Sequence, residues 1–150
     1  MVSLLYKKRI ININFNIFLA SAVATLLAAY PVMVVSRMNH SIAFILLSAF
    51  FIDALIDGLL FWGLHWYANY RNSQLQLFFR DYGLLQGHRV FLAFLFFILA
   101  TSTDYSLMVL FGFERAASFI FSYLTALIIT RIVHTIYGLK TGLFEEKQLK

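Results

Sequence analysis

Long apolar stretches separated by short polar turns dominate the pattern of this chain. The apolar stretches cover about 10–35, 41–66, 90–113 and 116–139, and each is long enough to cross a bilayer as a helix, which takes about 20 residues. Short polar turns separate the first stretch from the second and the third from the fourth. The pattern predicts an all-α integral membrane protein, with four transmembrane helices arranged as two hairpins in a single domain over residues 1–150.

The polar stretch between the second and third spans has a helical pattern of its own over about 72–88. Its apolar residues recur at helical spacing, with polar residues between them: Leu75, Phe78, Phe79, Tyr82 and Leu85. We predict a short interfacial helix in this middle cytoplasmic loop. Such a helix either docks a partner or connects the hairpins while its apolar face rests at the acyl boundary.

The basic residues predict the orientation of the spans. One side of the predicted topology carries Lys7, Lys8, Arg9, Arg71, Arg80, Arg89, Lys140, Lys147 and Lys150. The other side carries Arg37 and Arg115. Because cytoplasmic loops are enriched in Lys and Arg, we expect a multi-pass protein of the cell membrane with both termini in the cytoplasm.

Composition supports the membrane assignment and narrows the chemistry. Hydrophobic residues make up 61% of the chain, whereas soluble domains have about 45–50%. The chain has no cysteine, which excludes disulfides and thiolate metal sites. The net charge of +5 comes from residues that flank the spans, so it indicates topology and a lipid bilayer as partner, not a nucleic acid.

The first and third spans have different surfaces. Ala20, Ala24 and Ala28 follow one another at four-residue spacing, which lets a neighbouring helix approach closely and predicts that the first span is an interior packing helix. The third span carries bulky rings such as Phe91 and Phe94 instead. We expect this span to face lipid or a neighbouring subunit.

Ionisable residues inside the spans are the main candidates for function. Asp or Arg at the centre of a membrane helix costs about 2.5–3.5 kcal/mol, so each needs a partner or a role. Counting about 1.5 Å per residue along the second and fourth spans places Asp57 and Arg131 at similar depth. We predict that they pair, and that Asp53 and His134 extend the pair into a ladder.

Three interpretations of the ladder stay open. It is a buried ion-pair network that determines which helices pack together, or a relay for protons or ions, since histidine titrates near neutral pH. The third interpretation is a divalent metal site of Asp53, Asp57 and His134, as in a metal-binding subunit of a membrane oxidase. Arg131 argues against this site because its charge repels a cation. We assign no metal or cofactor.

A second polar group is expected near the outer end of the third span. Asp104 lies close to Thr101 and Thr103 there, and these side chains predict an outer polar pocket that either receives a ligand or simply satisfies the aspartate. The sequence contains no HExxH motif and no phosphate-binding glycine loop. These absences argue against an enzyme.

The segment 89–91, which reads Arg-Val-Phe, leads into a span that holds Thr101 and Asp104. With four short spans and both termini inside, this arrangement resembles the GtrA-like family of small membrane proteins. The resemblance implies movement of lipid-linked sugars. The chain departs from the family at residues 53–58 and 131–138, where Asn-rich and Arg-aromatic helix endings are usual, so the similarity covers the architecture and a handful of residues.

Two classes of function follow. The first is a non-catalytic subunit that packs against and stabilises a larger membrane complex, which the aromatic third span favours. The second is a small oligomeric transporter, or a flippase for lipid-linked sugars, that uses the ladder as its coupling site. A solvent path to the ladder would favour transport, whereas a sealed and fully paired ladder would favour the subunit. The expected partners are other membrane chains or a second copy.

Overall fold

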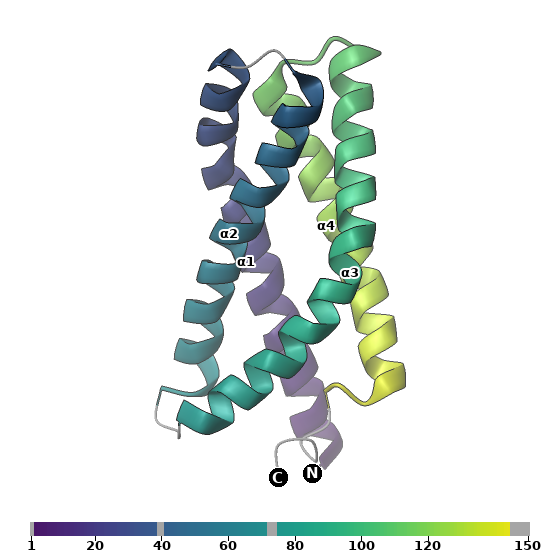
Figure 1. Ribbon diagram of the computed structural model, residues 1–150. Helices are drawn as coiled ribbons and strands as arrows, with labels where there is room; N and C mark the ends of the chain where they lie inside the picture. Colours follow the sequence, from purple (N-terminus) through teal and green to yellow (C-terminus); the bar gives the residue numbers. More distant parts are fainter. Residues whose placement is uncertain (1, 39–40, 72–74, 145–150) are drawn as a thin grey trace.

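The computed structural model describes residues 2–38, 41–71 and 75–144, with side chains from residue 9 onward (Figure 1). The chain forms α1 (Val2–Met38), α2 (Ile42–Asn69), α3 (Leu75–Val109) and α4 (Arg115–Thr141). Each helix is long and apolar enough to cross a membrane, and the described residues contain no strand. The predicted all-helical fold with four candidate membrane spans is confirmed.

The four helices form a bundle in which each helix packs mainly against two others. Helix α1 packs against α2 and α4, while α3 packs against α4 and more loosely against α2. Helices α1 and α3 therefore lie diagonally across the bundle. Figure 1 shows the start of α1 and the end of α4 at the same end of the bundle.

Helix α3 begins earlier than the third apolar stretch. Residues 75–88 are its first part, not the separate interfacial helix that was predicted, because no proline interrupts the periodic pattern before the span. Residues 72–74 of the predicted segment lie outside the described residues. Figure 1 shows this first part of α3 crossing the bundle obliquely. Phe78, Asp81 and Leu85 are buried along it.

Two apolar clusters form the core, one toward each end of the bundle. The first cluster consists of Ile13, Ile17, Ala20, Phe61, Leu85, Leu143 and Phe144. The second cluster consists of Ala28, Val32, Ala49, Ala100, Phe119, Tyr123 and Ala126. Ala20, Ala24 and Ala28 have no accessible surface, since their methyl side chains let other helices approach α1 closely.

The chain leaves α4 through a glycine turn and folds back onto the helix. Gly142 has a φ of +69°, a left-handed conformation that favours glycine. The fully buried Phe144 then covers Gly138, where an added Cβ atom would lie 2.5 Å from the Phe144 Cε2 atom. By contrast, a Cβ atom added at Gly63 of α2 would meet nothing within 4 Å.

This difference predicts opposite effects of two Gly→Ala substitutions. Gly63→Ala should keep or raise the free energy of unfolding, since alanine favours a helix by about 1 kcal/mol over glycine. Gly138→Ala should lower it by about 1–3 kcal/mol, because the Phe144 ring must move out of a packed site. Denaturation in mixed micelles measures both values. Equal gains for both variants would contradict the packing of Phe144 on Gly138.

Candidate functional site

A polar cavity of about 250 Å³ lies inside the bundle, and all four helices line it. Each helix supplies two polar side chains to its wall: Ser21 and Thr25, Asp53 and Asp57, Gln86 and Arg89, and Thr130 and Arg131. Along every helix, the cavity residues fall between the two core clusters. Polar groups are thus concentrated at one level of the bundle, between two apolar layers.

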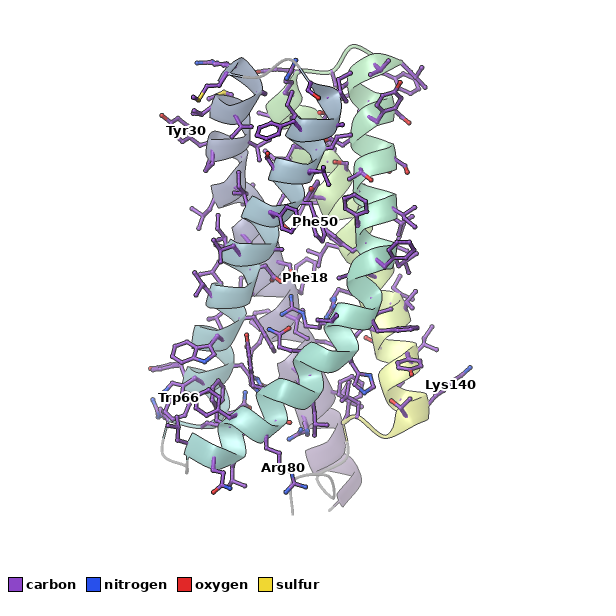
Figure 2. All side chains as sticks on the ribbon, viewed as in Figure 1. Phe18, Tyr30, Phe50, Trp66, Arg80 and Lys140 are labelled. Atoms are coloured by element: carbon purple, nitrogen blue, oxygen red, sulfur yellow. The ribbon has the colours of Figure 1, made fainter. Side chains whose placement is uncertain are left out.

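The cavity opens sideways, between α2 and α3. Ala54 of α2 and Val90 of α3 both line the cavity and are exposed on the surface of the bundle. On one side of this opening, the rings of Phe50 and Phe97 join the two helices, with centroids 5.0 Å apart. Figure 2 labels Phe50 in the middle of the bundle, between α2 and α3. The opening therefore lies along two candidate membrane spans, on the side of the bundle and not at its ends.

Asp57 has strong partners inside the cavity. Its carboxylate forms an ion pair with Arg89 of α3 and accepts a hydrogen bond from the Ser21 hydroxyl at 2.7 Å. The Arg89 guanidinium also lies over the Phe61 ring, 4.8 Å from the centroid. The structure therefore pairs Asp57 with Arg89. The predicted ion pair of Asp57 with Arg131 is not formed. Because α3 begins at Leu75, it carries Arg89 into the bundle instead of leaving it at the boundary.

Asp53 lies one turn from Asp57 and has fewer stabilising partners. The Asp53 side chain is 5% exposed and accepts a hydrogen bond from the Thr25 hydroxyl at 2.9 Å. No ion pair to Asp53 is found among the described residues. Of the two carboxylates of α2, Asp57 thus has a cationic partner among the described residues and Asp53 has a neutral one.

Arg131 brings to the cavity a charged group with two donors that have no acceptor in the described part of the chain. Its Nε and Nη1 atoms are buried and have no hydrogen-bond partner among the described residues, and the Nη1 atom of Arg89 is in the same state. Buried donors that lack acceptors are rare and costly, most of all when they are charged. Guanidinium groups bind carboxylate and phosphate oxygens through parallel hydrogen bonds. The donors of Arg131 and Arg89 are therefore suited to an anion.

Arg131 also lines a surface groove of about 400 Å³ between α1 and α4. The groove is mostly apolar, with walls that include Phe18, Ile132 and Ile136. At its polar edge, the Thr135 hydroxyl donates a hydrogen bond to Asn14 Oδ1 at 3.1 Å. Arg131 thus borders both the cavity and a groove on another face of the bundle.

His134 does not join the predicted ladder. It is fully buried, its ring packs against Phe144 with centroids 6.0 Å apart, and neither ring nitrogen has a partner among the described residues. It lies three residues beyond Arg131 and does not line the cavity with Asp53 and Asp57. In the described part of the chain, no group of three or more His, Asp or Glu residues could hold a metal ion.

Asp104 has a different partner from those predicted. Its buried carboxylate accepts a hydrogen bond from the Ser118 hydroxyl of α4 at 2.6 Å. The Thr101 hydroxyl donates to the backbone oxygen of Phe97 in its own helix, and Thr103 is half-buried. Among the described hydrogen bonds, neither Thr101 nor Thr103 donates to Asp104, so the predicted outer pocket stays a prediction. The Thr101 hydroxyl, which was expected to donate to Asp104, donates instead to the backbone of its own helix.

A second charged cluster joins three helices at the end of the bundle where α1 begins. Asp81 of α3 accepts hydrogen bonds from Arg9 and from the Tyr70 hydroxyl, each at 2.6 Å, and lies 3.0 Å from His65 Nε2. Burial, together with the Asp81 carboxylate, raises the pKa of the Tyr70 hydroxyl, which therefore stays a donor. Sequence reasoning placed Arg9 and Asp81 in separate boundary segments and missed this cluster.

Asp81→Asn should destabilise the bundle by about 2–5 kcal/mol, because it removes the charge that three donors share and leaves Arg9 unpaired. Tyr70→Phe is the matched control, since it deletes one of the three contacts and should cost less. Unfolding in mixed micelles gives both free energies. A loss for Asp81→Asn no larger than for Tyr70→Phe would show that the cluster is not a cooperative unit.

No protein-family model, curated protein or solved structure matches this chain. The candidate site therefore rests on the geometry of the chain itself. Its distinguishing features are an opening on the side of the bundle, the Asp57 carboxylate paired with Arg89, and an Arg131 guanidinium with two buried donors that lack an acceptor among the described residues.

Proposed function

We propose that this protein is a small membrane transporter that binds the anionic headgroup of a membrane amphiphile in its cavity and moves it across the bilayer. The observation that carries the proposal is Arg131. Its Nε and Nη1 donors are buried on a cavity wall and have no acceptor among the described residues. An anionic ligand supplies the missing acceptor oxygens and offsets the cost of burying the charge.

The direction of the opening favours an amphiphile over a water-soluble ion. A ligand that enters between α2 and α3 passes residues exposed on the membrane-facing surface, such as Ala54 and Val90. The headgroup of a lipid can enter there while its chains stay in the bilayer. The cavity of about 250 Å³ is slightly smaller than most ligand sites, which occupy about 300–1,000 Å³, so it suits a headgroup and not a whole lipid. Lipid-linked sugars, which the family resemblance implies, belong to this ligand class.

A binding measurement tests the proposal. The purified protein in neutral nanodiscs is titrated with dioleoylphosphatidylglycerol, with dioleoylphosphatidylcholine as the zwitterionic control and sodium sulfate as a soluble anion. We expect saturable binding of phosphatidylglycerol alone. Equal binding of the two lipids would contradict an anion site, and equally tight binding of sulfate would contradict an amphiphile as the ligand.

A second candidate function is a non-catalytic subunit of a larger membrane complex. The exposed rings on α3 favour it, because Phe91 and Phe94 are both 71% exposed. Lipid tails can cover such rings just as a partner protein can, so the exposed rings alone do not separate a subunit from a transporter. Purification in mild detergent separates these two candidate functions. Unrelated membrane chains that co-purify in fixed stoichiometry would support the subunit. Elution of the chain alone, or only with itself, would contradict it.

We also propose that both termini face the cytoplasm of a cell membrane. Figure 2 shows Trp66, Arg80 and Lys140 toward one end of the bundle and Tyr30 toward the other. The end with Arg80 and Lys140 is the more basic, as the positive-inside rule requires of a cytoplasmic face. Because the chain has no cysteine, Lys140→Cys and Arg37→Cys report the two ends separately. An impermeant maleimide should label only Arg37→Cys in intact cells; the reverse pattern would invert the topology.

A further inference from the structure

We infer that Asp53 is a proton-binding site, and that the cavity takes up a proton at Asp53 together with its anionic ligand. This inference rests on the proposed function, because it concerns the same cavity. It starts from the contrast between two carboxylates on one face of α2. Asp57 has a cation, Arg89, and a hydroxyl donor. Asp53 has only the neutral Thr25 hydroxyl as a described hydrogen-bond partner.

The charges around the cavity lead to the same conclusion. The groups that face Asp53 are Asp57 on its own helix, Arg89 on α3, and Arg131 and Tyr123 on α4, while α1 contributes only neutral hydroxyls. With Asp53 ionised, two carboxylates balance two guanidiniums. A bound monoanion would then leave one uncompensated negative charge in a low-dielectric site, which is costly. Protonation of Asp53 restores neutrality when the anion is bound.

This balance links the two ligands thermodynamically. A proton on Asp53 strengthens anion binding by removing a repulsive charge, and by reciprocity the bound anion favours the proton. Hydrogen bonding permits both states. A protonated Asp53 can keep accepting from Thr25 with one oxygen, while its other oxygen carries the proton.

The proton site is tested first, without any lipid ligand. Infrared difference spectra of the protein in neutral nanodiscs report the carbonyl stretch of protonated carboxyl groups as the pH is varied. Asp53→Asn should remove one titrating component from this signal. Asp104→Asn is the control, because it removes a buried carboxyl group outside the cavity and should leave the Asp53 component intact. Identical titrations for the wild type and Asp53→Asn would overturn the inference.

The coupling is tested by the pH dependence of phosphatidylglycerol binding, since this phosphodiester keeps its charge across the range. In the wild type, Kd should fall as the pH is lowered, by up to about tenfold per pH unit for one linked proton. Asp53→Asn, which mimics the protonated side chain, should bind tightly and without pH dependence, while Asp104→Asn should behave like the wild type. A wild-type Kd independent of pH would overturn the coupling. If phosphatidylglycerol does not bind at any pH, the proposed function and the coupling fail, whereas the infrared titration still decides the proton site.

Discussion

Replacing Arg131 by Gln should weaken phosphatidylglycerol binding by about 10- to 100-fold, because a hydrogen bond to a charged group contributes about 1.5–3 kcal/mol. The same substitution should leave the free energy of unfolding unchanged or raise it, since it removes a charged group whose buried Nε and Nη1 donors have no acceptor among the described residues. These two effects together distinguish a ligand-binding arginine from a structural one. Titration in nanodiscs and unfolding in micelles measure them on the same sample.

Arg37→Gln is the matched control for Arg131. It removes the same charge from an exposed residue in the last turn of α1, outside the cavity. Binding to this variant should equal binding to the wild type. An Arg131→Gln variant that unfolds more easily and binds phosphatidylglycerol normally would show that the arginine supports the fold and not a ligand.

The second large effect is expected for the ion pair of Asp57 and Arg89. Asp57→Asn or Arg89→Gln alone should destabilise the bundle by about 3–5 kcal/mol, because each substitution leaves a buried charge without its partner. The double variant should lose less than the sum of the two losses, with a coupling energy of about 1–3 kcal/mol. Unfolding free energies of the four proteins in this cycle provide the measurement.

A parallel cycle of Asp57→Asn and Arg131→Gln is the control. The sequence predicts that this pair interacts, whereas the structure contains no ion pair between the two side chains. Its coupling energy should therefore be smaller than that of Asp57 with Arg89. A larger coupling for Asp57 with Arg131 would restore the pairing expected from depth alone and contradict the geometry of the cavity.

The four spans could be predicted from the sequence because crossing a bilayer as a helix takes about 20 apolar residues, a signal that is local in the chain. The helix ends were less predictable. Helix α3 extends the third span back to Leu75, since the polar residues before the span keep a helical period. Phe78, Leu85 and Leu92 are buried at helical spacing, and continuing their pattern carries Arg89 into the bundle.

The ionisable candidates Asp53, Asp57 and Arg131 could also be predicted, since charges inside apolar spans stand out. Their partners could not. Whether Asp57 meets Arg89 or Arg131 depends on the tilt and rotation of whole helices, and depth along a span does not determine either. For the same reason, the sequence did not identify Ser21 and Thr25 as partners, although their hydroxyls donate to the two carboxylates.

Transport itself is tested most directly by lipid translocation in proteoliposomes. Phosphatidylglycerol with a fluorescent acyl chain is placed in both leaflets, and dithionite added outside quenches the outer label. With the wild-type protein, the label in the inner leaflet should become accessible to dithionite over time. The Arg131→Gln variant should not expose the inner label, and the wild-type protein should not expose fluorescent phosphatidylcholine. Quenching that stops at the level of protein-free liposomes would contradict the claim that the cavity moves an anionic headgroup across the membrane.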